Sequence, residues 1–248
     1  MEVIICKNPK ELGERAAAKT AGLLRQAIEK RGGARLLLST GASQFTTLEA
    51  LVKEEVDWSK VEMFHLDEYL DLPPDHPASF VGYLQQRFVS KVPLKAAHFV
   101  DTTQGAERII ARLSDLLAQA PVDVGLIGIG ENAHIAFNDP PADFELDACY
   151  QVVTLDRACR NQQLGEGWFP TLEDVPRQAV SMTVRQIMKC SHIISAVPFA
   201  VKAQAVYRTL TSPQVTNQIP ATILKTHPDA TLYLDADSAS LLKKERRA

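Results

Sequence analysis

Apolar residues recur along this chain with two spacings that alternate from one segment to the next. Apolar runs typical of buried strands lie at residues 2–6, 34–38, 61–66, 98–100, 122–127, 192–197 and 231–234. Between these runs, apolar residues at helical spacing predict helices over about residues 10–30, 44–53, 104–119 and 200–210. Gly32 and Gly33 end the first of these helices.

Strands that alternate with helices predict a Rossmann-like α/β fold, in which a doubly wound, mostly parallel sheet carries helices on both faces. The chain has no internal repeat, low-complexity run or convincing linker, and 248 residues suit one large α/β domain. We therefore predict a single domain over residues 1–248. A basic tail at residues 243–247 is interpreted as a solvated helix end rather than a nucleic-acid patch.

Composition narrows the class of protein. The chain is 46% apolar and 23% charged with a net charge of -3, so it has no basic excess to attract nucleic acid or anionic lipid. No apolar run approaches membrane-spanning length. The four cysteines lack C-x-x-C spacing, the six histidines do not cluster with them in the sequence, and no secretory leader pattern opens the chain. We expect a reduced, cytoplasmic protein with no metal site and no nucleic-acid or membrane partner.

Ligands of doubly wound sheets bind beyond the carboxyl ends of the strands, so the residues that follow each strand are the candidate site residues. The run at 34–38 is followed by a loop of hydroxyls around a glycine: Ser39, Thr40, Gly41, Ala42 and Ser43. Such a loop before a helix suits a phosphate group. The alternative is that Ser43 is only a helix N-cap and Gly41 only a turn residue.

Charged residues follow two other strands. Asp67 and Glu68 come directly after the run at 61–66, and a paired carboxylate raises the pKa of its neighbour, as a general base requires. The alternative is a pair of solvated loop acids. Lys202 lies in the first turn of the predicted helix after residue 197, where a cation is unfavourable unless an anion binds there. A chance surface position is equally compatible with this lysine.

The stretch G-I-G-E-N-A-H-I-A-F-N-D-P-P at residues 128–141 permits two interpretations. Its first six residues match the dinucleotide-binding pattern G-x-G-x-x-A, which requires a long helix to follow. Pro140 and Pro141 leave no room for that helix. We therefore expect a tight glycine turn that delivers His134 to the strand end, with Asp139 near enough to hydrogen-bond its imidazole.

Taken together, these stretches resemble the glucosamine-6-phosphate deaminase (isomerase) family over nearly the whole chain. The resemblance rests on the order and spacing of several motifs: S-T-G-A-S with T-T-L-E-A-L, F-H-L-D-E-Y-L-D-L-P with H-P-A-S-F, G-I-G-E-N-A-H-I-A-F-N-D-P, T-L-D, D-V-P-R-Q-A-V-S-M-T, and the lysine of V-K-A-Q-A-V. It implies conversion of an amino sugar phosphate and water to fructose 6-phosphate and ammonia, without a cofactor.

The resemblance also implies roles for individual residues. Asp67 would move a proton between C2 and C1 through an enediol-like intermediate, and His134 would open the sugar ring by shuttling a proton to and from O5. Asp139 stands where the family usually has a glutamate that supports this histidine, and Asn132 would orient the catalytic groups. The phosphate would be held by Ser39, Thr40, Gly41, Ala42, Ser43 and Lys202, and further substrate contacts would come from Glu68, Gly130, Ala133 and Arg160.

The sequence departs from the family pattern at the segment T-R-x-A-N-x-R, which supplies a second basic phosphate ligand in other members. Arg160 keeps its first arginine, whereas the second is replaced near Gly165. Asp139 is also one methylene shorter than glutamate. The chain stops before the longer C-terminal segment of hexameric members, so we do not expect feedback regulation by an acetylated sugar phosphate.

Several alternatives stay open on the sequence alone. A 6-phosphogluconolactonase would share the fold and a glycine-histidine loop, but H-I-A-F-N-D-P and D-E-Y-L-D-L-P favour the deaminase. A sugar-phosphate sensor is disfavoured because no helix-turn-helix precedes the fold and both proton-transfer groups are present. We expect a small-molecule sugar phosphate as substrate and a monomer or small homo-oligomer. The preferred amino sugar, the oligomeric state and the existence of an allosteric effector are not determined by the sequence.

Overall fold

A computed structural model describes residues 1–165 and 167–242, and its centre is a parallel sheet. All neighbouring strands of this seven-stranded sheet run parallel, which confirms the predicted doubly wound α/β class. In spatial order the strands are β1 (Glu2–Ile5), β10 (Ala230–Leu234), β9 (His192–Val197), β6 (Val124–Ile127), β2 (Ala34–Leu38), β3 (Val61–His65) and β5 (Ala96–His98).

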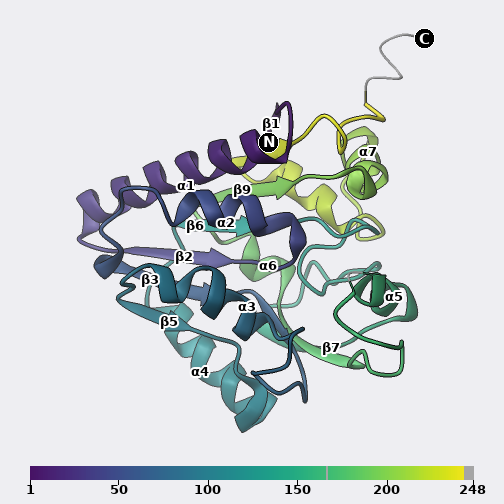
Figure 1. Cartoon of the computed structure of the whole chain (residues 1–248), viewed down its shortest axis with the longest axis horizontal. Helices are drawn as coiled ribbons and strands as arrows, with labels where there is room; N and C mark the ends of the chain where they lie inside the picture. The colour runs from purple at the N-terminus through teal and green to yellow at the C-terminus, as the bar shows by residue number, and fades with distance from the viewer. Residues whose placement is uncertain (166, 243–248) are drawn as a thin grey trace.

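Helices cover both faces of this sheet (Figure 1). Side chains alternate between the faces of a strand, so Leu36 and Leu38 of β2 pack with α1 and α2 while Leu37 packs with α4 and α7. None of the described helices combines the length and hydropathy needed to cross a bilayer. The α-helices are α1 (Pro9–Arg31), α2 (Phe45–Leu51), α3 (Phe80–Arg87), α4 (Ala106–Gln119), α5 (Arg157–Gly165), α6 (Val184–Ile187) and α7 (Ala203–Thr211).

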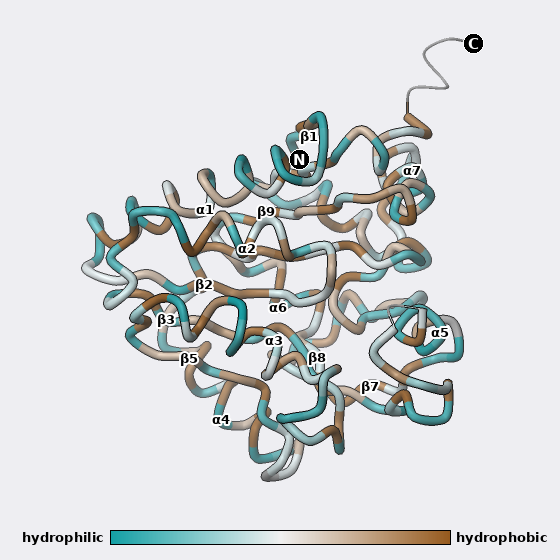
Figure 2. The backbone as a smooth tube through the Cα atoms, in the orientation of Figure 1, coloured by the Kyte–Doolittle hydropathy of each residue, from teal (hydrophilic) through white to brown (hydrophobic). Residues whose placement is uncertain are grey.

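Helix α1 shows how local sequence sets the ends of an element. The side chain of Asn8 accepts a hydrogen bond from the backbone N–H of Glu11 at 2.9 Å, and Pro9 occupies the first turn. Gly32 ends the helix at φ 79°, a left-handed conformation that favours glycine. Figure 2 shows hydrophobic positions along the central strands and hydrophilic positions on the outer turns of α1. The helix is therefore held by its buried apolar face.

A second, three-stranded antiparallel sheet lies beside the carboxyl ends of the parallel strands, and the sequence analysis missed it. Its order is β4 (Asp67–Tyr69), β8 (Gln178–Met182) and β7 (Tyr150–Thr154). Tyr150, Val180 and Met182 belong to the same apolar cluster as Leu37 of β2. The two sheets thus share one core, which supports the prediction of a single domain.

Several predicted boundaries shift in the structure. Strand β5 lies at Ala96–His98 instead of residues 98–100, because its pairing with β3 ends at His98. The predicted helices at 44–53 and 200–210 each begin with a 3-10 turn, η1 (Ala42–Gln44) and η5 (Ala200–Lys202). The basic tail at 243–247 lies outside the described residues.

Candidate active site

A pocket lies beyond the carboxyl ends of four adjacent strands, β9, β6, β2 and β3, where the sequence predicted a ligand site. The strand order reverses between β6 and β2, and such switch points leave a crevice at the sheet edge. The lining comprises Ser39, Thr40, Gly41, Ala42, Ser43, Leu66, Asp67, Phe80, Gly128, Ile129, Gly130, Glu131, His134, Ala136, Phe137, Gln162, Gln163, Phe199, Val201 and Lys202.

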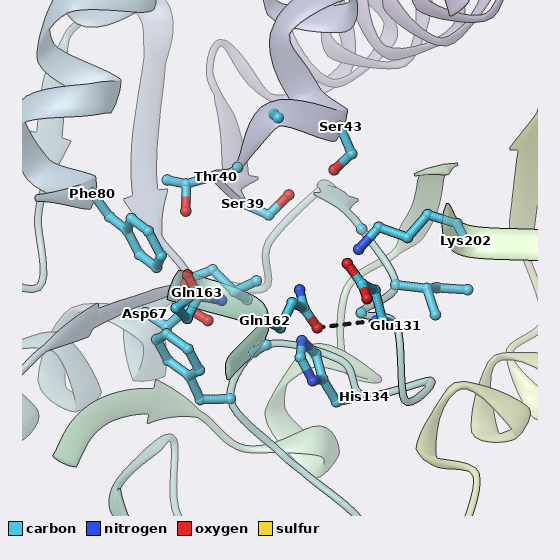
Figure 3. A pocket seen from close by; sticks show the side chains of 18 of the residues that line it. Ser39, Thr40, Ser43, Asp67, Phe80, Glu131, His134, Gln162, Gln163 and Lys202 are labelled. Carbon is cyan, nitrogen blue, oxygen red and sulfur yellow. Dashed lines mark hydrogen bonds between the residues drawn. The ribbon is translucent and has the colours of Figure 1, made fainter. Parts of the chain in front are cut away.

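The hydroxyl loop after β2 forms one wall of the pocket (Figure 3). Ser39 is buried, and its Oγ has no hydrogen-bond partner among the described residues. The loop is held from behind by Tyr83, whose hydroxyl donates to the carbonyl of Gly41 at 2.9 Å. Because a buried hydroxyl without a partner is costly, the Ser39 side chain is suited to bind a ligand oxygen.

The structure excludes the alternative role of Ser43 as a helix cap. The N-cap of α2 is Gln44, and no side chain makes a capping hydrogen bond there. The Oγ of Ser43 instead accepts from the Gln44 amide at 3.1 Å. Gly41 adopts φ 96°, a conformation that favours glycine. The loop is thus shaped around the pocket rather than around the helix end.

Lys202 provides a positive charge on the same side of the pocket. It is buried, ends η5 and is the N-cap of α7, and Figure 3 shows its side chain extending into the pocket toward Glu131, below the hydroxyl loop. Phe199, which precedes η5, has φ 81° and donates its backbone N–H to both carboxylate oxygens of Asp235 at 3.2 Å. Asp235 is fully buried and also accepts from the N–H of Ser238. These bonds hold the unusual Phe199 backbone, and with it η5, in place.

Asp67, the first residue of β4, faces the pocket from the other side (Figure 3). It is only 5% exposed. Burial, followed by the charge of Glu68, raises the pKa of Asp67 to about 8, although a hydrogen bond from the Phe137 backbone opposes this shift. The interpretation of these acids as solvated loop residues is therefore wrong. A carboxyl group with a pKa near neutrality can both take up and release a proton.

Glu68 does not line the pocket. Its carboxylate accepts from the N–H of Tyr69 at 2.9 Å, the hydroxyl of Ser79 at 3.0 Å and the N–H of Val81 at 2.8 Å. Burial raises the pKa of Glu68 to about 7, while these hydrogen bonds act in the opposite direction. The side chain ties β4 to the start of α3, so the structure does not support direct substrate contact by Glu68.

His134 enters the pocket from the loop after β6, as predicted. Its Nδ1 lies 2.9 Å from Asp139 Oδ1, so aspartate reaches the imidazole despite its shorter side chain. Asn132 donates its amide to the same Asp139 oxygen at 2.9 Å and accepts from the backbone N–H of His134 at 3.1 Å. Gly130 is also required, because a Cβ at this position would lie 2.1 Å from His134 Nε2. The loop thus fixes the ring with Nε2 toward the pocket.

The charge on Asp139 supports this arrangement. Burial acts to raise the pKa of Asp139, but the hydrogen bond and charge of His134 and the amide of Asn132 hold it below its ordinary value. An ionised Asp139 favours a proton on Nδ1 of His134, which leaves Nε2 as the proton acceptor. Asn132 and Ala133 do not line the pocket, and Ala133 instead adopts φ 71° in the tight turn.

The fold brings a cysteine to the histidine, which the sequence spacing did not suggest. Ligand atoms of His134, Asp139 and Cys159 lie within 4.8 Å of one another. Metal binding would require a thiolate, but burial and then the charge of Asp139 raise the pKa of Cys159 far above its ordinary value. The donor set therefore favours a neutral thiol beside the His134–Asp139 pair over a metal ligand. All four cysteines are free.

Arg160 corrects an expectation from the sequence. Its guanidinium donates to the backbone carbonyls of Leu172 and Val175, so it stabilises the segment after α5 and does not line the pocket. Gly165, where the second arginine of the family pattern was judged to be replaced, does not line it either. The residues that α5 supplies to the pocket are Gln162 and Gln163.

Further lining residues were not predicted from the sequence, among them Phe80, Glu131 and Phe199. Gln162 of α5 contacts the loop after β6, because its Oε1 accepts a hydrogen bond from the backbone N–H of Glu131 at 3.2 Å (Figure 3). Phe80 begins α3, which carries little apolar periodicity, and no strand precedes it directly. The only sequence signal for Gln162 and Gln163 was their place in the segment that replaces the arginine motif.

Comparison with known proteins relates this geometry to a family. The sequence profile of the family described as glucosamine-6-phosphate isomerases/6-phosphogluconolactonase matches residues 7–233. The chain belongs to this family. Curated members include a glucosamine-6-phosphate deaminase of Lactobacillus delbrueckii subsp. bulgaricus, which is 32% identical over 98% of this chain and 100% of the relative. Another, from Streptococcus pneumoniae, is 35% identical over 86% of this chain and 89% of the relative.

Solved structures of the glucosamine-6-phosphate isomerase/6-phosphogluconolactonase family share the fold. A monomeric glucosamine-6-phosphate deaminase superposes with a TM-score of 0.87 at 29% identity, over 97% of this chain and 100% of the other. The 6-phosphogluconolactonase of Trypanosoma brucei gives a TM-score of 0.79 at 16% identity, over 97% and 98% of the two chains. The second likeness concerns the fold alone.

Proposed function

We propose that the protein is a glucosamine-6-phosphate deaminase that converts glucosamine 6-phosphate and water to fructose 6-phosphate and ammonia without a cofactor. The observation that carries this proposal is a buried Asp67 with a pKa of about 8, which shares one pocket with the His134–Asp139 pair. Membership of the family and the deaminases among its similar members support the same reaction.

The phosphate group is assigned to the side of the pocket formed by the hydroxyl loop and Lys202. The Oγ of Ser39 lacks a partner among the described residues, and Lys202 lines the same pocket with a positively charged side chain that can bind a phosphate oxygen. Thr40, Gly41, Ala42 and Ser43 complete this wall. A phosphate bound here leaves the sugar carbons on the side of Asp67.

Ring opening is assigned to His134. Its Nε2 takes the proton of the O1 hydroxyl and delivers a proton to the ring oxygen O5 as the bond between C1 and O5 breaks. The product is the open-chain aldehyde. Asp139 stabilises the imidazolium that forms between the two transfers, because its carboxylate lies 2.9 Å from Nδ1.

Isomerisation and deamination are assigned to Asp67. The carboxylate removes the C2 proton, which gives an enediol-like intermediate that carries the amino group on C2. The same proton returns to C1, so that C2 becomes an imine. Water then adds to C2 and ammonia leaves, which yields the ketone of fructose 6-phosphate. Burial keeps bulk water away from the proton while it moves.

We also infer a cytoplasmic location and a monomer or small homo-oligomer. The monomeric deaminase with the similar fold supports the lower end of this range. No nucleic-acid or membrane partner is proposed, because the net charge is -3.

An assay of ammonia release tests the proposal. Purified protein is expected to release ammonia from glucosamine 6-phosphate, with galactosamine 6-phosphate and 6-phosphogluconolactone measured in parallel. Fructose 6-phosphate should form in equal amount. Hydrolysis of the lactone without ammonia from either amino sugar would contradict a deaminase, and binding without turnover of any of the three would indicate a sensor.

Gly130→Ala is expected to abolish most of this activity, by about 10²- to 10⁴-fold in kcat, as for loss of a general acid or base. The new Cβ would overlap the His134 ring, so the imidazole must leave its position. The matched control is Gly165→Ala, because an added Cβ there meets nothing within 4 Å. Inhibition by inorganic phosphate should be unchanged in both variants. A Gly130→Ala protein with wild-type kcat would remove His134 from the mechanism.

A further inference from the structure

Gln163 is held in a fixed orientation by a tyrosine of the small sheet. The hydroxyl of Tyr69 donates to Gln163 Oε1 at 2.5 Å, and both residues are almost fully buried. The Tyr69 ring packs against Phe80, Phe137 and Phe169, with ring centroids 4.9–5.7 Å apart. The hydroxyl therefore has little freedom, and it occupies the carbonyl end of the Gln163 amide.

The nitrogen of the Gln163 amide, Nε2, makes no hydrogen bond to a described residue. Gln163 also lines the pocket, so a bound ligand can reach this nitrogen. A primary amide carries two N–H donors. Because Gln163 lines the pocket and no described residue accepts from its Nε2 group, both N–H donors are available to an oxygen of a ligand bound there.

The position of Gln163 indicates which part of the ligand it meets. Asp67 and Tyr69 are separated by two positions along β4, so their side chains project from the same face of the strand. Figure 3 shows Gln163 beside Asp67 and Phe80, with Lys202 on the opposite side of the pocket. Gln163 thus lies at the end of the pocket where carbon atoms react, away from the phosphate-binding loop.

We propose that Gln163, oriented by Tyr69, donates a hydrogen bond to a sugar oxygen at the reacting end of the substrate. This role rests on the proposed deaminase function. An N–H donor cannot bind the ammonium group of an amino sugar, so its partner is a hydroxyl or carbonyl oxygen. Oxygen on C1 gains negative charge when Asp67 removes the C2 proton, and a donor buried at this point stabilises that charge. Gln163 therefore serves the chemical step more than initial binding.

Four variants test the proposal. Gln163→Leu replaces the amide with an apolar side chain of similar size. Gln163→Glu keeps an acceptor for the Tyr69 hydroxyl but removes both N–H donors. Tyr69→Phe keeps the aromatic packing and removes only the hydroxyl. The control is Asn161→Leu, which alters an exposed amide on the same helix outside the pocket.

Steady-state kinetics with glucosamine 6-phosphate should separate catalysis from binding. Both Gln163 variants are expected to lose about 10- to 10³-fold in kcat, with KM changed less than about threefold, since the phosphate contacts remain. Tyr69→Phe should lose less in the same direction. It should add nothing further in a Gln163→Leu background, because the hydroxyl acts through the amide. Inhibition by inorganic phosphate should match the wild type in every variant.

The outcomes distinguish this role from the function on which it rests. An active wild type with unchanged kcat in either folded Gln163 variant, as judged by circular dichroism and thermal melting, would overturn the role of Gln163 alone. Additive losses in the double variant would remove Tyr69 from it. A wild type that releases no ammonia would overturn the deaminase function and this role together. Should Gln163→Leu fail to fold, Gln163→Glu decides, because it keeps the bond to Tyr69.

Discussion

Asp67→Asn is expected to lower kcat by about 10²- to 10⁴-fold, or roughly 3 to 5 kcal/mol of transition-state stabilisation. Asparagine keeps the shape of the side chain and can still hydrogen-bond, but it cannot accept the C2 proton. Binding should suffer much less, because the phosphate contacts are on the other side of the pocket. The change therefore isolates the proton-transfer role.

Exchange at C1 of fructose 6-phosphate in deuterated water measures this step directly, even where ammonia release is limited elsewhere. The Asp67→Asn protein should bind fructose 6-phosphate with near-normal affinity and lose the exchange. The matched control is Asp71→Asn, since Asp71 is an exposed acid that follows β4 and does not line the pocket. Exchange at the wild-type rate in folded Asp67→Asn would assign the base to another residue.

The pH dependence of kcat/KM should also reflect the ionisation of Asp67. Burial raises the pKa of Asp67 to about 8, so below this pH most of the free enzyme carries a protonated carboxyl group that cannot act as a base. The value of kcat/KM should therefore rise as the pH increases toward about 8 and level off above it. A profile that is flat from about pH 6 to about pH 9 would contradict a base with this raised pKa.

Lys202→Ala is expected to raise KM for glucosamine 6-phosphate by about 10- to 100-fold, as for loss of a hydrogen bond to a charged group. The lysine is buried beside the hydroxyl loop, so solvent cations cannot replace it fully. The effect on kcat at saturation should be smaller, because the proton carriers stay in place.

Two comparisons check the assignment of Lys202. Lys53→Ala removes an exposed lysine that follows the end of α2, and it should leave KM unchanged. Inorganic phosphate should inhibit Lys202→Ala less strongly than the wild type. If both KM and kcat of Lys202→Ala equal those of the wild type, the phosphate binds elsewhere.

The inner strands of the central sheet could be predicted because they are buried on both faces and read as apolar runs; these are β2, β3, β6, β9 and β10. The small sheet could not be predicted in this way. Strand β4 has three residues, two of them acids, and its pairing with β8 joins segments more than 100 residues apart. Strand β7 gave no clear period-two signal either, because Val152, on the same face as the buried Tyr150, is 43% exposed.

The pocket could be predicted as far as parallel strands determine it. Residues that follow β2, β3, β6 and β9 meet because the ends of adjacent parallel strands share one edge. No comparable rule places α5 at the pocket. Its position depends on the packing of Cys159, and of Phe169 after the helix, in one apolar cluster. Arg160 therefore followed the family motif in sequence but not in space, while Gln163 went unnoticed.

The shared construction of the pocket has a consequence for how its chemistry can change. The hydroxyl loop and Lys202 follow strands of the parallel sheet, whereas Asp67 and Tyr69 belong to the antiparallel sheet. Substitutions in β4 or α5 can therefore alter the reaction without displacing the residues proposed to bind the phosphate group. His134 follows β6 of the parallel sheet, so ring opening shares a scaffold with phosphate binding, whereas the C2 base lies on a separate element that can change independently.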